Sequence, residues 1–259
     1  MELRVRGGKS DRLLVIKGEI DHENVGDLVR AFEETAAAAS ADVNLDLTGV
    51  TYIDSAGICA FYDLADRLDW HGLVRITGIS RDLHRIFHIS GLLVHDRVRV
   101  ATEDMAATTV SGGNAGSCPE GAMSSWTRSF PARLDQLAPV RAFVEEIATR
   151  VALAGSRAYD LKLAVSEAAA NAIEHGQKGG DLGVVAICRA DRITVTVSHP
   201  GDFRPRPPGD PARLHRGMGL PIMLALTDEV TVSRLQGGGT CVSLSVYLGS
   251  ATKVSAVRG

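Results

Sequence analysis

The sequence predicts an α/β protein with two domains. The chain has 259 residues, which is more than one domain commonly contains. Of these residues, 45% are hydrophobic and 23% are charged, a composition typical of an ordinary globular protein. Strand and helix patterns also follow a different order in the two halves, and the halves are not repeats of each other. We therefore expect separate cores at residues 1–102 and 128–250, joined by a flexible linker at 103–127.

In the N-terminal half, short runs rich in β-branched residues alternate with helical patterns. The expected strands are at residues 13–17, 43–47, 73–77 and 97–100, and the expected helices at 24–38, 56–70 and 81–90. Such alternation predicts a sheet with helices packed on it.

Residues 101–127 are rich in Gly, Ser, Thr and Ala and have no sustained period, which is typical of a linker. The C-terminal half then begins with two long helical patterns. Its expected helices are at residues 134–151, 158–176 and 218–226, and its expected strands at 183–189, 192–197, 229–235 and 240–248. Helices stacked on one face of a mainly antiparallel sheet would account for both the helical and the strand periodicity of this half.

Composition excludes several classes of protein. A net charge of -3 provides no broad basic surface, so direct binding to nucleic acid is not expected. There is no membrane span of about 18 apolar residues and no signal peptide at the start, so we expect a cytoplasmic protein. The four cysteines lie far apart without a C-x-x-C pair, which argues against zinc and against a disulfide framework.

The first candidate site is Ser55, which falls at or beside the start of an expected helix. As an N-cap, its hydroxyl would accept from first-turn N–H groups and contribute about 1 kcal/mol. Alternatively it is a phosphoacceptor, because a phosphate would bring about -1.5 to -2 charges to the positive helix end. Asp21 and His22 follow a strand and could line the same partner-binding surface, or simply form a turn.

Three stretches of the N-terminal half resemble landmarks of anti-anti-sigma factors, the STAS family. They are GEIDH at 18–22, DSAGI at 54–58 and LHRIFHISGL at 83–92. The resemblance covers about residues 1–100 and implies that a cognate kinase phosphorylates Ser55. It also implies that the dephosphorylated form binds the kinase and that phosphorylation releases it. Ala56 departs from the family, in which a second hydroxyl residue is common, so Ser55 has no neighbouring fallback acceptor.

The second candidate site lies on the helix expected at 158–176, where Glu167 and Asn171 are four residues apart and share a face. Glu167 could take a proton from an attacking hydroxyl, and Asn171 could ligate Mg²⁺ held by nucleotide phosphates. A solvated polar face is the alternative. Gly217 and Gly219 precede a short helix, whose N–H groups could approach phosphate without obstruction by a Cβ.

Four segments in order resemble the boxes of anti-sigma-factor serine kinases, which have the GHKL ATPase sandwich fold. They are SEAAANAIEHG at 166–176, VSHPGDF at 197–203, RGMGL at 216–220 and GT at 239–240. Residues 130–141 fit as well, so the resemblance spans roughly residues 130–248. The family order of these segments is harder to explain by chance than any one of them.

The resemblance implies roles for individual residues of the C-terminal half. Glu167 would be the general base, Asn171 would hold Mg²⁺, and the other residues expected to bind the nucleotide are His199, Gly201, Gly217, Gly219 and Thr240. Arg141 matches an arginine on the family's partner-binding helix, although an ordinary surface arginine is the alternative.

His199 departs from the family, which has an aspartate there that accepts from the adenine amino group. A neutral imidazole accepts one hydrogen bond but lacks the charge of a carboxylate. Nucleotide affinity is therefore expected to be reduced, or adenine recognition altered. Asp202 is an alternative acceptor whose spacing does not match.

The two resemblances together imply a partner-switching regulator of a bacterial sigma factor. Its C-terminal half would bind ATP and Mg²⁺, act as a protein serine kinase on a STAS serine of its own chain or of a separate protein, sequester a sigma factor, and form a homodimer. The alternative is a binding scaffold without kinase activity, because His199 has weakened the ATP site.

Overall fold

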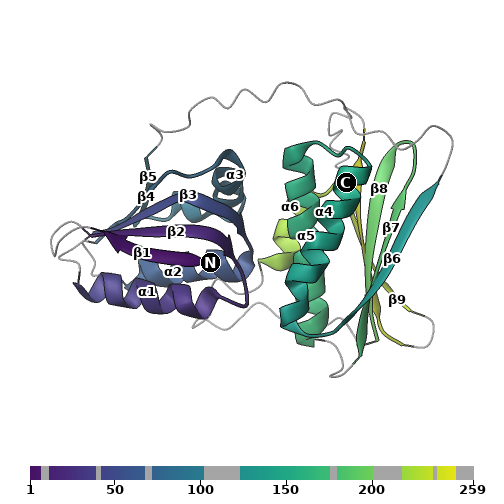
Figure 1. Cartoon of the computed structure of the whole chain (residues 1–259), viewed down its shortest axis with the longest axis horizontal. Helices are drawn as coiled ribbons and strands as arrows, with labels where there is room; N and C mark the ends of the chain where they lie inside the picture. Colours follow the sequence, from purple (N-terminus) through teal and green to yellow (C-terminus); the bar gives the residue numbers. More distant parts are fainter. Residues whose placement is uncertain are drawn as a thin grey trace, which may run out of the picture. The chain divides into compact units, whose positions relative to one another are not determined.

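The structure, a computed structural model, describes residues 1–6, 12–38, 42–67, 72–101, 123–175, 180–200, 218–235 and 238–248. The chain forms two compact units. The N-terminal unit carries strands β1 to β5 and the C-terminal unit carries β6 to β10, each in a sheet of its own (Figure 1). Because the two units are separate bodies, each is described by itself.

The sheet of the N-terminal unit has its five strands in sequence order. They are β1 (Glu2–Arg6), β2 (Leu13–Ile20), β3 (Val43–Ile53), β4 (Val74–Thr77) and β5 (Val98–Val100). The first pair is antiparallel and all later pairs are parallel. Helical connections between successive parallel strands are right-handed, which places the helices on one face of such a sheet.

Three helices and a 3-10 turn make these connections: α1 (Val25–Ala38), α2 (Ser55–Arg67), α3 (Arg81–Ile89) and η1 (Leu92–Val94). Their aromatic side chains meet in one core. The ring of Phe61 in α2 lies 5.3 Å from that of Phe32 in α1 and 5.4 Å from that of Phe87 in α3. This contact confirms the predicted sheet with helices packed on it.

The C-terminal unit has a sheet of order β6-β7-β8-β10-β9 in which every pair is antiparallel. Its strands are β6 (Ser124–Pro131), β7 (Asp181–Cys188), β8 (Arg192–His199), β9 (Glu229–Arg234) and β10 (Thr240–Tyr247). Its helical elements are η3 (Leu134–Gln136), α4 (Leu137–Arg150), α5 (Gly155–His175) and α6 (Gly219–Leu226).

Helices and sheet of the C-terminal unit form two layers (Figure 1). Alternate residues of β7 and β8, such as Val184 and Val195, are buried toward the helices, while their neighbours are partly exposed. The middle of α5 is buried almost all round, because α4, α6 and the sheet pack against it. The predicted arrangement of helices on an antiparallel sheet is confirmed.

Two edge strands were not predicted. None of the residues of β1 is buried, and β6 buries only Phe130. Strands that cover no core show little apolar alternation, so periodicity does not find them. β6 begins at Ser124, inside the segment that composition indicates to be a linker; residues 102–122 of that segment lie outside the described residues.

The strand β3 is longer than predicted. A turn is expected after Leu47, but the strand continues to Ile53 because its parallel pairing with β2 continues. The register shifts on the way, and Gly49 pairs with Lys17. A Cβ at Gly49 would lie 2.4 Å from the Cγ of Lys17, so glycine is needed for this close approach. The extra residues carry Asp54 to the edge of the sheet.

Two expectations from composition concern cysteines and membranes. Cys59 and Cys241 are free thiols, and Cys188 is disulfide-bonded. The expectation that the chain has no disulfide framework, a set of several such bonds, stays a prediction. Within the described ranges, no helix combines the length and apolar character required to cross a bilayer.

Candidate functional site

The N-terminal candidate site lies at the edge of the sheet where β2 and β3 end. The two strands are parallel neighbours, and Ile20 pairs with Ile53 at their last position. The backbone N–H of Asp54 then donates to the carbonyl of Ile20 at 3.1 Å. Because parallel strands end at the same edge, the turn after β2 and the start of α2 lie side by side.

Asp54 caps helix α2. Its Oδ1 accepts from the backbone N–H of Gly57 at 3.0 Å, and its side chain is 1% exposed. Ser55 is partly buried and is the first residue of the helix, so its predicted place at the helix N-terminus is confirmed, whereas its interpretation as the N-cap is wrong. A Cβ at Gly57 would lie 2.7 Å from both Ile20 and Ile53, which shows how closely α2 approaches the strand ends.

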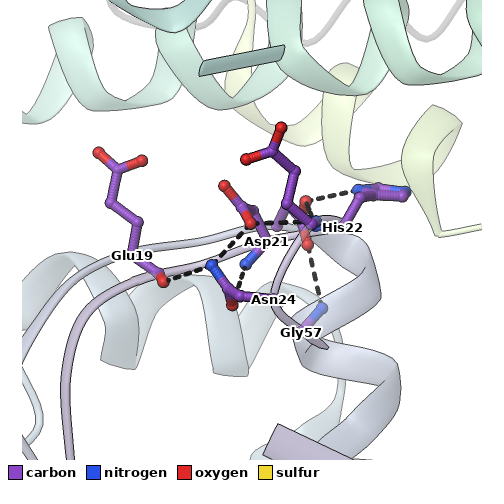
Figure 2. A network of polar contacts seen from close by, with 7 residues as sticks. Glu19, Asp21, His22, Asn24 and Gly57 are labelled. Atoms are coloured by element: carbon purple, nitrogen blue, oxygen red, sulfur yellow. Dashed lines mark hydrogen bonds and ion pairs between the residues drawn. The ribbon is translucent and has the colours of Figure 1, made fainter. Parts of the chain in front are cut away.

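His22 joins the turn after β2 to this cap. Its backbone N–H donates to Oδ2 of Asp54 at 3.0 Å, and its Nδ1 lies 2.6 Å from the same oxygen. Figure 2 shows the two contacts converging on the carboxylate beside the N–H of Gly57. With three donors on one buried carboxylate, the residue before Ser55 is held firmly in place.

Asp21 forms the turn that presents His22. Its Oδ1 accepts from the backbone N–H of Glu23 at 3.1 Å and from Nδ2 of Asn24 at 2.7 Å (Figure 2). Asn24 also donates to the carbonyl of Glu19 at 3.0 Å. The turn-forming alternative therefore describes Asp21, and binding of a partner by Asp21 and His22 stays a prediction.

In the C-terminal unit the candidate residues lie at one end of the sheet. Helix α5 ends at His175 and β7 begins at Asp181, so the C-terminal end of α5 lies near the start of β7. β8 is antiparallel to both β7 and β10, so the end of β8 lies beside the starts of those two strands. A Cβ at Gly180, just before β7, would lie 2.7 Å from Pro200, just after β8, in agreement with this placement.

Glu167 and Asn171 of α5 meet the first residue of α6. A Cβ added to Gly219 would lie 2.9 Å from Oε2 of Glu167 and 3.1 Å from Nδ2 of Asn171. Glu167 is 2% exposed, so the alternative of a solvated polar face is wrong for it. Residues predicted from two separate motifs therefore lie against each other, with a carboxylate at the N-terminal end of a helix.

His199 and Thr240 are paired across β8 and β10. Both are buried, and burial lowers the pKa of His199 below its ordinary 6.5, so its imidazole is neutral at pH 7. Gly239 has a φ of +105°, and a Cβ there would lie 2.5 Å from the carbonyl oxygen of His199. Glycine is thus required where the chain enters β10.

The structure says less about the remaining three predicted residues. Gly201 and Gly217 lie outside the described residues. Arg141 lies on α4 and is 3% exposed, so it is not an ordinary surface arginine, and its binding of a partner stays a prediction.

Comparison with protein families matches both units. Residues 130–246 match the histidine kinase-like ATPase domain, and residues 2–104 match the STAS domain. The serine-protein kinase RsbW of Bacillus pumilus is 30% identical over 136 residues, which cover 46% of this chain and 83% of the relative. The anti-sigma F factor of a Thermoanaerobacter species is 35% identical over 101 residues, covering 35% and 71%.

The chain belongs to the family of these anti-sigma-factor serine kinases and carries a STAS domain before the kinase-like one. Among solved structures, an anti-sigma factor antagonist from Mycobacterium paratuberculosis aligns with 40% of this chain and 88% of its own, at 18% identity and a TM-score of 0.36. Below, the N-terminal unit is the STAS unit and the C-terminal unit is the kinase-like unit.

Sequence reasoning missed how Asp54 and His22 act in the STAS unit. Aspartate is as good an N-cap as serine, and it stands directly before Ser55, so the sequence contained the signal. The contact between His22 and Asp54 spans 32 residues and required the parallel pairing of β2 and β3, which no local pattern reveals.

Proposed function

We propose that this chain is a partner-switching regulator of a bacterial sigma factor. Its kinase-like unit is a protein serine kinase that uses ATP and Mg²⁺, and Ser55 of its STAS unit is a phosphoacceptor. Family membership supports nucleotide use and the kind of partner, since the relatives are named serine-protein kinases and anti-sigma factors. The observation that carries the proposal is the contact of Gly219 with Glu167 and Asn171.

The side chains at this contact fit a nucleotide with its metal. Gly219 leaves open the place that a Cβ would fill beside Glu167 and Asn171, at the N-terminal end of α6. The amide oxygen of Asn171 is a suitable ligand for Mg²⁺, which when bound would neutralise phosphate charge. In the transfer, Glu167 takes the proton of the serine hydroxyl while that oxygen bonds to the γ-phosphorus of ATP and ADP leaves.

His199 and Thr240 are proposed to face the nucleobase. A neutral imidazole offers one donor and one acceptor, depending on its tautomer, where a carboxylate would offer charged acceptors only. This difference favours weak or altered base recognition. It also gives the alternative function its support: a docking scaffold that regulates a sigma factor without transferring phosphate.

Ser55 is proposed as the acceptor of the chain's own kinase or of a kinase of the same kind. Its place as first residue of a capped helix supports this, because a phosphate there meets the positive end of α2. A separate STAS protein is a second substrate of the same class.

The proposal places the chain in the cytoplasm as a homodimer formed by the kinase-like unit. Support for the homodimer comes from the sheet face turned away from the helices. There Thr194 bonds Ser245 at 2.9 Å and Thr196 bonds Ser243 at 3.0 Å, beside an ion pair of Arg192 with Glu229. A second copy could cover this polar face of β8 and β10.

Phosphate transfer to Ser55 is the decisive measurement. We expect the full chain, incubated with ATP and Mg²⁺, to gain one phosphate on the peptide that contains Ser55, detected by intact-mass and peptide mass spectrometry. Glu167→Gln keeps the shape but not the base, so the rate should fall about 10²- to 10⁴-fold, while Ser55→Ala should take up no phosphate.

The control is nucleotide binding, which is measured by calorimetry in the same variants. A Glu167→Gln chain that binds ATP as the parent does but transfers no phosphate would support the kinase. A parent chain that binds no nucleotide and gains no phosphate, yet retains a sigma factor, would establish the scaffold instead.

A further inference from the structure

The described residues at the edge of the STAS unit that carries Ser55 are mainly acidic. At the end of β2, in the turn after it, and in the first turns of α1 and α2, the ionisable side chains are Glu19, Asp21, Glu23, Asp27, Asp54 and Cys59, together with His22. Asp27 already pairs with Arg30 of its own helix. A phosphate on Ser55 would therefore arrive among carboxylates, directly beside the buried one of Asp54.

His22 is placed to offset that charge. Its Nδ1 faces Oδ2 of Asp54 at 2.6 Å, and its side chain is 15% exposed, so the imidazole keeps access to solvent protons. In an imidazole the second nitrogen, Nε2, points away from the first. The ring of His22 and the dashed line of this contact can be followed in Figure 2.

We propose that His22 is the counter-ion of phosphorylated Ser55: the phosphate drives His22 to take up a proton from solvent, and Asp54 holds the resulting imidazolium beside it. This rests on the proposed role of Ser55 as phosphoacceptor. The only covalent change is the N–H bond formed on the ring, and the proton comes from water.

The physical reason is the cost of like charges. A phosphoserine carries about -1.5 to -2 charges near pH 7, and without compensation it would repel Asp54 and compete with it for the N–H of Gly57. A protonated His22 carries the opposite charge and is already bonded to Asp54. The cap of α2 is thereby kept when Ser55 is modified.

Coupling of this kind is reciprocal. If phosphate favours protonation of His22, a protonated His22 must equally favour the dianionic phosphate. We expect phosphorylation to raise the pKa of His22 by about one unit or more, tenfold in the protonation equilibrium, and the second pKa of the phosphoserine to fall by a matching amount.

The test uses the full chain with phosphoserine installed at position 55 during translation, so that it does not depend on the chain's own kinase. Histidine ring signals are followed against pH by ¹H–¹⁵N NMR, and the phosphate by ³¹P NMR, in the phosphorylated and unmodified chains. His22→Gln assigns the His22 signals. His95, which faces Asp66 at 3.3 Å in the same unit, is the matched control, and its ring signals should be the same in the phosphorylated and unmodified chains.

A His22 pKa that is the same in both forms would overturn the inference. The ³¹P titration gives a second criterion: His22→Gln should raise the second pKa of the phosphoserine relative to the parent, and no difference would contradict us. Unchanged His95 signals verify that the variant is folded. If the unmodified chain never phosphorylates itself, the proposed kinase activity on Ser55 is wrong. The inference about His22 is still tested in that case, because the phosphate is installed during translation.

Discussion

The two candidate sites are built in different ways. In the STAS unit, hydrogen bonds between side chains and backbone fix the residue before Ser55, because one buried carboxylate collects three donors. In the kinase-like unit, the defining feature is the close approach of a backbone, that of Gly219, to the carboxylate of Glu167. One site is sensitive to the loss of polar partners, and the other is sensitive to added volume.

The difference matches what each site is proposed to do. A phosphoacceptor has to be presented in one conformation, and a helix cap joined to a neighbouring turn provides this. A nucleotide site needs exposed backbone N–H groups near a base, and glycine provides them because it has no Cβ. Two kinds of substitution therefore test this difference: one removes a polar partner at the STAS site, and the other adds volume at the kinase-like site.

The largest effect is expected from adding a methyl group at Gly219. In Gly219→Ala the new Cβ would lie 2.9 Å from Oε2 of Glu167 and displace the base. Since misplacing a catalytic group by about 1 Å can cost about 10²-fold in rate, we expect phosphate transfer to fall about 100-fold. The rate of phosphate incorporation, measured by mass spectrometry, checks this.

Gly155→Ala is the matched control, because a Cβ there meets nothing within 4 Å. It makes the same chemical change on α5 and should leave the rate unchanged. Equal rates in parent and Gly219→Ala would mean that this contact is not part of the catalytic site.

An intermediate effect is expected from removing the polar partner at the other site. Asp54→Ala deletes the cap of α2 and the acceptor of His22, which should destabilise the start of α2 by about 2 kcal/mol. Hydrogen exchange of peptides that cover residues 55–67, followed by mass spectrometry in the full chain, should become faster.

Two further variants sharpen this result. Asp54→Asn keeps an oxygen that caps the helix but loses the charge, so exchange should increase less than in Asp54→Ala. Asp63→Ala removes an exposed carboxylate of the same helix and should leave exchange at the start of α2 as in the parent. If all three variants exchange alike, Asp54 is not what holds the start of α2.

These sites also show what the sequence could predict. The helical period of α5 placed Glu167 and Asn171 on one face, and the glycine pattern placed Gly219 at the start of α6. Periodicity could not bring α6 to α5, because that contact joins residues 48 apart along the chain, from Asn171 to Gly219. Local patterns predicted most of the elements, the family resemblance added several of the candidate residues, and long-range packing decided which of them touch.

The same limit applies to burial. Nothing in the segment around His199 indicated that its imidazole would be buried, because histidine is intermediate between the residues that are usually buried and those that are usually exposed. The pairing of β8 with β10, and the close approach of Gly239, produced that burial. The lowered pKa of His199 follows from this burial and therefore from the folded structure, not from the local sequence.

The smallest effect is expected from the pH dependence of the kinase-like unit. Burial lowers the pKa of His199 below the 6.5 of the unfolded chain, so below pH 6.5 the unfolded state binds more protons than the folded state. The contribution of neutral His199 to the free energy of unfolding is therefore complete above pH 6.5. It is lost as the pH falls, first through the pKa of His199 in the unfolded state and then through its lower pKa in the folded state. For one group the slope is at most about 1.4 kcal/mol per pH unit.

His199→Asn replaces the imidazole with a side chain that does not titrate in this range. We expect the melting temperature of the kinase-like unit in the parent chain to decrease between pH 7 and pH 5.5, and the decrease to be smaller in His199→Asn. Equal decreases in the two chains would mean that His199 gains its proton in the folded state as readily as in the unfolded one. The imidazole would then be reachable by water, and the proposed neutral contact with a nucleobase would lose its basis.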